Sequence, residues 1–267
     1  MSDNTNKYIL VKLDAFINSY NIEQALADSN INIGMTLGMN AEHQVDYNDT
    51  NHRYWYEWSK KIHEIKDELY NHRNDLILSG PGPLSLFTMF GLRLTKHTIH
   101  RVRYFMNYDN RRQKWIKLDL RPETNDVNYP GIIEMISPVN PRSTGKIVLF
   151  ITLDTSFVMT PKNIEEIVNL NQQQGHDTLG IFTIRYAKEG CRLELETKHI
   201  PSIEACFKNM LHSLKTRYEN NDGLVIITTG PSVLSLLIGS WINVHIHGQP
   251  LFIERVGQEY KSAFFHY

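Results

Sequence analysis

Apolar and polar positions along the chain repeat with two periods, one typical of strands and one typical of helices. Residues 30–39 alternate polar or small side chains with apolar ones, which predicts a strand. Residues 53–71 instead carry apolar side chains at steps of three and four, the period of one helical face. Similar patterns predict further strands at residues 75–79, 99–107, 114–120, 146–153, 178–186, 192–198, 223–227, 249–255 and 261–267, and further helices at residues 21–27, 84–94, 162–173, 203–219 and 232–242.

Strands and helices therefore alternate along most of the chain. This order is typical of α/β proteins, in which mostly parallel sheets are built from strand–helix–strand units. A loop-rich connector with four prolines, residues 121–144, lies near the middle around a short element at residues 132–136.

The chain contains an internal repeat. Residues 76–97 align without a gap on residues 224–245, at a constant offset of 231 − 83 = 148. Any two strand–turn–helix units share apolar positions, but that resemblance does not explain a shared Gly-Pro pair followed by a glycine eight positions later. We therefore infer a duplication, in which two similar halves pack with pseudo-two-fold symmetry and their strand ends and helix starts face one cleft. The identical pairs are Leu76/Leu224, Gly82/Gly230, Pro83/Pro231, Leu86/Leu234, Gly91/Gly239 and His97/His245.

Composition and charge narrow the function classes. The 267 residues carry 28 Lys and Arg against 29 Asp and Glu, so the formal net charge is −1. This balance argues against a surface that coats long nucleic acid, which requires many uncompensated cations. The chain has no apolar run long enough for a membrane span, and its first residues lack the pattern of a signal peptide. With only two cysteines, we expect reduced thiols and a cytoplasmic protein.

The two Gly-Pro junctions are candidate ligand-binding loops. A glycine lets a ligand approach the backbone, and the free N–H groups of the following helix turn can hold a phosphate. In α/β sheets ligands bind at the carboxyl ends of strands, where both loops are predicted to lie. A well-capped helix without a ligand is the alternative for either loop alone. The candidate residues are Ser79, Gly80, Pro81 and Gly82 in the first copy, and Thr228, Thr229, Gly230, Pro231 and Ser232 in the second.

Three further segments carry polar or aromatic residues that suit a nucleotide. Asp154, Thr155, Ser156 and Phe157 follow a predicted strand, and their side chains can contact a ribose or a base edge. Gly38 and Met39 are interpreted as the counterpart of that loop in the first half. Arg53 and Tyr54 begin a helix, where an arginine beside aromatic rings can pair with a phosphate and stack a base. The alternatives are turn and capping roles for the loops, a solvated Arg53, and core positions for the aromatic residues.

Enzyme and metal motifs are scarce. The sequence has no GxSxG, HExxH, GxxxxGK[ST] or GxGxxG pattern, so no catalytic residue is assigned and no dinucleotide cofactor is expected. His245 and His247 would share one face of an extended strand, and His266 lies near the end of the chain. These histidines lack a third ligand at a suitable spacing, so we expect no metal site.

Residues 75–94 (DLILSGPGPLSLFTMFGLRL) and 223–243 (GLVIITTGPSVLSLLIGSWIN) resemble the two halves of a SAVED domain. Residues 147–154 look like the strand that opens the second half, and residues 264–267 (FFHY) look like its last strand. The resemblance implies two fused CARF-like Rossmannoid units: residues 30–135 as the first half and 136–267 as the second, with residues 1–29 as an N-terminal segment.

The resemblance also implies a function. SAVED domains sense cyclic oligonucleotides, such as cyclic oligoadenylates, in the antiphage systems CBASS and type III CRISPR. The expected ligand is a cyclic tri- or tetranucleotide in the cleft between the halves. Because no effector motif is present, the resemblance implies a separate effector subunit and head-to-tail assembly on ligand binding. The alternatives are a ring nuclease that cleaves the same messenger and an unrelated Rossmannoid enzyme that processes a nucleotide.

Overall fold

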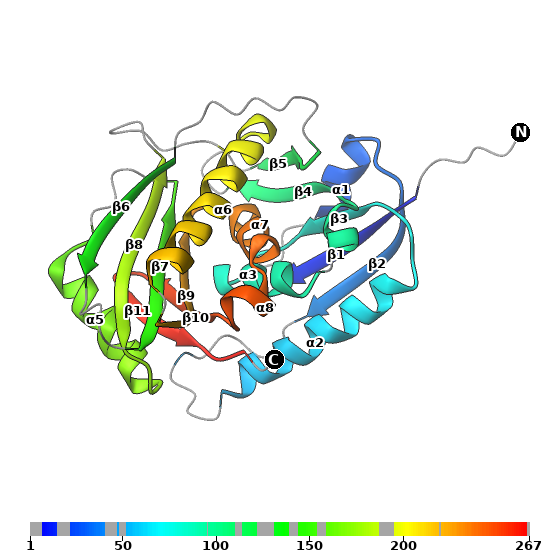
Figure 1. Ribbon diagram of the computed structural model, residues 1–267. Coiled ribbons are helices and arrows are strands. Elements are labelled where there is room, and N and C mark those ends of the chain that lie inside the picture. The colour runs from blue at the N-terminus through cyan, green and yellow to red at the C-terminus, as the bar shows by residue number, and fades with distance from the viewer. Residues whose placement is uncertain are drawn as a thin grey trace, which may run out of the picture.

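The fold consists of two α/β halves that lie side by side (Figure 1). The structure is a computed structural model that describes residues 7–14, 22–40, 47, 52–94, 96–109, 114–121, 131–138, 144–153, 159–186, 195–218 and 220–265. The first half contains β1 (Tyr8–Asp14), α1 (Ile22–Asp28), β2 (Ile33–Asn40), α2 (Arg53–Tyr70), β3 (Leu76–Ser79), α3 (Leu84–Arg93), α4 (Lys96–Ile99), β4 (Val102–Asp109) and β5 (Lys114–Asp119). The second contains β6 (Gly131–Pro138), β7 (Gly145–Thr152), α5 (Pro161–Gln173), β8 (Thr178–Tyr186), the 3-10 helix η1 (Thr197–His199), α6 (Ile200–Arg217), β9 (Asn221–Thr229), α7 (Ser232–Trp241), α8 (Val244–His247), β10 (Leu251–Val256) and β11 (Glu259–Ala263).

The two sheets have the same topology. The first sheet has the strand order β2-β1-β3-β4-β5, and the second has β8-β7-β9-β10-β11 with β6 added beside β8. In both sheets the strands pair in parallel except for the last hairpin, β4–β5 or β10–β11, and β6 is antiparallel to β8. The short helices α4 and α8 also correspond, at the same offset of 244 − 96 = 148. The prediction of two similar α/β halves is therefore confirmed.

The predicted domain boundaries placed two strands, β1 and β6, outside the sheets to which they belong. Strand β1 lies between β2 and β3, so part of the segment set apart as residues 1–29 is a central strand of the first sheet. Strand β6 pairs with β8, which places residues 131–138 in the second sheet. An edge strand such as β6 makes its contacts through pairing with a distant segment, and local periodicity does not encode that partner.

Three local predictions were wrong. Strand β11 ends at Ala263, so Phe264 and Phe265 follow the last strand instead of forming it. His245 and His247 lie in the short helix α8, so the extended pair of imidazoles does not exist. Residues 197–199 form a 3-10 helix where a strand was predicted. Each of these segments lies at a junction between elements, where local periodicity gives little guidance, and Thr197, Phe264 and Phe265 also contact the first half.

Helices α3 and α7 form the centre of the molecule, between the two sheets. Residues 85–91 of α3 and 233–239 of α7 are all buried. A helix that is buried on every side must be apolar on every side, which explains why neither sequence shows an amphipathic stripe. Helix α2, in contrast, is amphipathic as predicted, with Trp55, Trp58 and Ile62 on its buried face.

The two repeated glycines allow α3 and α7 to touch through their backbones. A β-carbon on Gly91 would lie 2.0 Å from the carbonyl oxygen of Leu236, and one on Gly239 would lie 1.9 Å from that of Thr88. Gly91 and Gly239 differ by 148 positions, as do Thr88 and Leu236, so each helix makes the same contact with the other. This reciprocal contact is the structural reason for the conserved spacing of the repeat within this chain.

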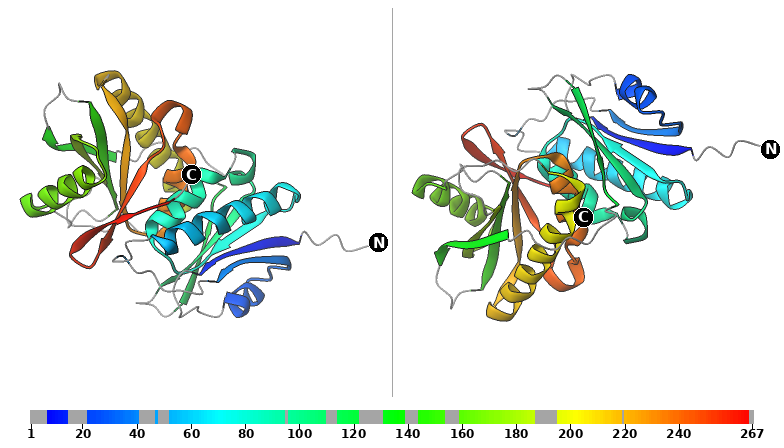
Figure 2. Two further views of the ribbon diagram at one scale, coloured as in Figure 1. Left: turned by 90° about the horizontal axis from the view of Figure 1, so that it is seen from below. Right: turned by 90° about the horizontal axis from the view of Figure 1, so that it is seen from above.

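The two halves also contact each other at their edges. Phe264 stacks on His52 with ring centres 3.7 Å apart, and Phe265 packs edge-on to Trp55 at 4.8 Å. At the pseudo-equivalent junction the hydroxyl of Thr197 donates to the carbonyl of Asp119 at 2.5 Å. Figure 2 shows the two halves side by side, with the C-terminal segment running against the first half. No helix in the described part of the chain is long and apolar enough to cross a membrane.

The variant Gly91→Ala tests the α3–α7 contact. The added methyl group meets backbone atoms, so the helices must move apart, and we expect the free energy of unfolding to fall by about 3 kcal/mol. Urea denaturation of the whole chain measures this loss, with Ser240→Ala on α7 as the control that adds no atoms.

The double variant Gly91→Ala/Gly239→Ala makes the test sharper. Once the helices have separated for one methyl group, the second enters space that is already open, so the two losses should sum to more than the loss in the double variant. Strictly additive losses, or a loss in Gly91→Ala no larger than in Ser240→Ala, would show that the close contact does not limit stability.

Candidate functional site

The two strand-to-helix loops are the best candidates for a ligand-binding site. In the first, β3 ends at Ser79 and Pro83 precedes α3; in the second, β9 ends at Thr229 and Pro231 precedes α7. Both prolines are extended, with ψ of 143° and 141°. The two loops therefore enter their helices with the same backbone conformation, but the residues around the two loops differ.

The first loop is closed by the rest of its own half. A β-carbon on Gly80, whose φ is +136°, would lie 2.5 Å from the carbonyl group of Leu13 at the end of β1. The buried hydroxyl of Ser79 donates to the carbonyl of Met106 in β4 at 3.1 Å. Gly80 and Ser79 thus hold the loop against neighbouring strands, and Pro81 and Gly82 are half-buried beside them.

A carboxylate from the second half already lies at the start of α3. Glu254 of β10 is only 5% exposed, and its side-chain oxygen accepts a hydrogen bond from the backbone N–H of Ser85 in the first turn of α3. Burial raises the pKa of this carboxyl from its ordinary value of 4.5 to about 7. The position that attracts anions at a helix start is therefore filled from within the chain.

Glu254 interacts electrostatically with two tyrosines, Tyr47 and Tyr54. Burial raises the pKa of Tyr47 and of Tyr54, and the charge of Glu254 adds to both shifts. The hydroxyl groups of Tyr54 and Ser85 are buried and find no hydrogen-bond partner among the described residues. Tyr54, predicted to bind a ligand, is thus a core residue at the junction between the halves.

The second loop is open. Gly230 is exposed with φ of +131°, and a β-carbon there would meet only a methyl group of Leu234 at 3.9 Å. Thr229 and Ser232 are half-buried, and their hydroxyls make no hydrogen bond with a described residue. Thr228 is not available in the same way, because its buried hydroxyl accepts a hydrogen bond from Ser235 at 2.8 Å.

The two loops are therefore not equivalent. Phe252 pairs with Ile226 in β9, and Phe105 pairs with Leu78 at the equivalent place of β3. By strand register the residue of β4 that corresponds to Glu254 is therefore Asn107, which is half-buried and uncharged. The start of α7 offers backbone N–H groups, two hydroxyls and an accessible glycine, which suits a phosphate or another polar acceptor. The sequence repeat predicted two equal loops, and only the second has this open arrangement.

The remaining candidates fall into three groups. Arg53 is exposed at the start of α2, where its guanidinium pairs with the carboxylate of Glu57 at 3.0 Å. Gly38 and Met39 lie in β2, an edge strand. That strand corresponds to β8, whereas the counterpart of β7 is β1, so the interpretation of Gly38 and Met39 as counterparts of the loop after β7 was wrong. Asp154, Thr155, Ser156 and Phe157 lie outside the described residues.

Among the described residues, no three His, Cys, Asp or Glu side chains are grouped so that they could hold a metal ion.

Comparisons with known proteins support the fold. No protein-family model matches the sequence, and no curated protein matches it. The structure is similar to the Acinetobacter baumannii Cap4 SAVED/CARF-domain containing receptor with the cyclic trinucleotide 2′3′3′-cAAA, at a TM-score of 0.63 and 15% sequence identity over 96% of this chain and 50% of that one. The same receptor with 3′3′3′-cAAA gives a TM-score of 0.59 at 17% identity and the same coverage. A further structure of the receptor gives 0.55 at 14% identity, over 96% of this chain and 49% of that one.

This chain thus has the two-half SAVED/CARF-like fold that its sequence resemblance implied, and it spans about half the length of these receptors.

The buried carboxyl of Glu254 makes a prediction about stability and pH. Because its pKa is raised in the folded state, the folded chain holds a proton between about pH 5 and 7 that the unfolded chain has lost. The free energy of unfolding should therefore fall as the pH rises through this window, by about 1 kcal/mol per pH unit. Urea denaturation at pH 5, 6 and 7 measures the slope.

Glu254→Gln removes the titrating proton and keeps an oxygen that accepts from Ser85, so the slope should become flatter in this variant. Glu259→Gln is the matched control on the adjacent strand β11, because Glu259 is exposed and its pKa is lowered by Lys261. An unchanged slope in Glu254→Gln would show that this carboxyl does not titrate in the window.

Proposed function

We propose that this chain is a sensor that binds a cyclic oligonucleotide, a cyclic tri- or tetranucleotide, at the open loop between β9 and α7. The observation that carries the proposal is the fold: both halves match receptors solved with cyclic trinucleotides, over 96% of this chain. The open loop supplies the local chemistry that such a ligand needs.

The loop Thr229–Ser232 would hold a phosphate group of the ligand. The N–H groups of the first turn of α7 and the hydroxyls of Thr229 and Ser232 are the donors, and Gly230 lets the ligand approach the backbone. Because the chain has a net charge of only −1, binding depends on these local donors and not on a positively charged surface.

Glu254 makes the proposed site asymmetric. A phosphate at the start of α3 would meet this carboxylate, whereas a phosphate at the start of α7 would not. We infer that the ligand uses the second loop for its phosphate contact. Since α7 packs directly on α3, a displacement of α7 on binding would also displace α3 and so change both halves.

Signalling then requires a ligand that binds one conformation better than the other. In this proposal the sensor acts on a separate effector subunit in antiphage defence, of the CBASS or type III CRISPR kind, with head-to-tail assembly of copies as the step that ligand binding promotes.

Calorimetric titration with cyclic di-, tri- and tetranucleotides tests the binding claim. We expect one cyclic tri- or tetranucleotide to bind and the variant Thr229→Ala/Ser232→Ala to bind it at least tenfold more weakly, because two hydrogen bonds to a charged group are lost. The matched control is Ser213→Ala/Thr216→Ala on the exposed face of α6, where both hydroxyls bond only to their own helix.

Two outcomes would overturn the proposal. Absence of binding by every cyclic oligonucleotide would remove the sensor function. Equal affinity in the loop variant and the control variant would remove this loop as the site. Chromatography of the recovered ligand separates sensor from ring nuclease, because the sensor returns an intact ring and a nuclease returns linear fragments.

A further inference from the structure

A pocket in the second half lies far from the proposed binding loop. Its volume is about 350 Å³, and its wall comes from the last turns of α6, the start of β9 and the helix α8. Asp222 in this wall and Thr229 in the binding loop are seven residues apart on the same strand, or about 23 Å. We call this cavity the α6–α8 pocket; Leu211, Leu214, Lys215, Tyr218, Ile246 and His247 are among its lining residues.

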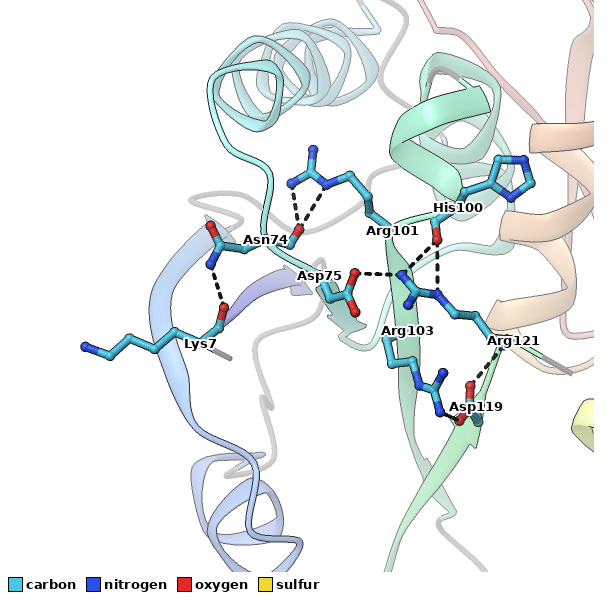
Figure 3. A network of polar contacts seen from close by, with 8 residues as sticks. All are labelled: Lys7, Asn74, Asp75, His100, Arg101, Arg103, Asp119 and Arg121. Atoms are coloured by element: carbon cyan, nitrogen blue, oxygen red, sulfur yellow. Dashed lines mark hydrogen bonds and ion pairs between the residues drawn. The ribbon is translucent and has the colours of Figure 1, made fainter. Parts of the chain in front are cut away.

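In the first half an arginine spans the corresponding elements. The guanidinium of Arg101 donates to the carbonyl of Asn74 before β3 at 2.9 and 2.7 Å (Figure 3). It also donates to the carbonyl of Leu69 in the last turn of α2 at 3.0 Å. The residue that corresponds to Arg101 is Gln249, at 249 − 101 = 148, and it is exposed. At position 249 the second half therefore lacks the guanidinium that ties these three elements together in the first half.

The floor of the α6–α8 pocket is apolar. Leu211, Leu214 and Leu224 are at most 5% exposed and line it from α6 and β9. Tyr218 adds a half-buried ring, and Ile246 at the rim is 49% exposed. This lining suits a flat apolar group.

The polar groups of the pocket favour an anion. Lys215 makes no ion pair with a described residue. Nδ1 of His247 accepts from the backbone N–H of Asn243 at 3.3 Å, so the neutral ring carries its proton on Nε2 and can donate it. The carboxylate of Asp222 is balanced by Lys146, whose Nζ lies 3.6 Å away. The ring of His176 lies 4.0 Å from Asp222, and burial lowers its pKa. One uncompensated cation and one imidazole donor thus remain beside an apolar floor.

We propose that the α6–α8 pocket binds a small organic anion that has a flat apolar body and a single phosphate or carboxylate group. Lys215 and His247 contact the anionic group, and the leucines and Tyr218 contact the apolar body. The volume lies at the low end of the range for ligand pockets, which suits a nucleoside monophosphate or an aromatic carboxylate. This site is separate from the loop at Thr229 and does not depend on the proposed sensor function.

The His247 ring reports on binding directly. Burial and the charge of Lys215 lower the pKa of His247, and an anion beside the ring would raise it. Histidine NMR titrations of the full chain with adenosine 5′-monophosphate and with indole-3-acetate, each up to 10 mM, distinguish the two sources of the ligand; His247→Gln assigns the signal. We expect the titration midpoint of His247 to rise with at least one probe, and Lys215→Gln to weaken that probe about tenfold.

Gln249→Arg is the sharpest variant, because it supplies the second half with the counterpart of Arg101. We expect it to abolish the shift of His247 while the chain remains folded, and Gln258→Arg in the exposed β10–β11 turn is the matched control with the same charge. A His247 midpoint that neither probe moves would overturn the proposal. So would binding that Lys215→Gln and Gln249→Arg leave unchanged.

Discussion

The backbone contacts of Gly91 with Leu236 and of Gly239 with Thr88 are the constraint on which the arrangement of the halves depends. Each glycine lies against a backbone carbonyl of the other helix at a distance that no side chain permits. The contact brings two fully buried helices together, and the two sheets take their places on either side of that pair. The aromatic contact of His52 with Phe264 and the hydrogen bond from Thr197 to Asp119 then join the edges of the halves.

Symmetry at the helix pair is broken at the loops that precede it. Glu254 extends from the second sheet to the start of α3, where its carboxyl oxygen occupies the place that an anion would take. Its counterpart by strand register, Asn107, is uncharged and makes no hydrogen bond to the described first turn of α7. The duplicated fold thus keeps the contact between α3 and α7 in both copies. The loop before α3 is closed by other parts of the chain, and the loop before α7 stays accessible. The same divergence recurs at the opposite end of the sheets, where Arg101 and Gln249 differ.

The fold was predictable from the sequence to the extent that its signals are local. The period of α2, the apolar run of β7 and the repeated Gly-Pro junctions all predicted the elements that the structure contains. The loop after β9 was also predicted, because its residues are contiguous in the chain. Pairing partners were not predictable in this way: β1 joins the first sheet and β6 the second through contacts that periodicity does not encode.

Glu254 was missed for a related reason, since its role depends on a helix 169 residues away in the chain. A signal was present, because a single carboxylate stands inside the apolar strand Leu251–Val256, and a buried acid in such a strand needs a partner. The sequence could not name Ser85 as that partner.

The proposed sensor function requires that a cyclic oligonucleotide binds at the start of α7 and not at the start of α3. Amide NMR of the full chain, titrated with a cyclic trinucleotide, compares the two loops in one experiment. We expect the largest shifts at Gly230 and Ser232 in the second loop. Largest shifts at Gly80, Gly82 and Ser85 in the first loop, or no shift in either, would contradict it.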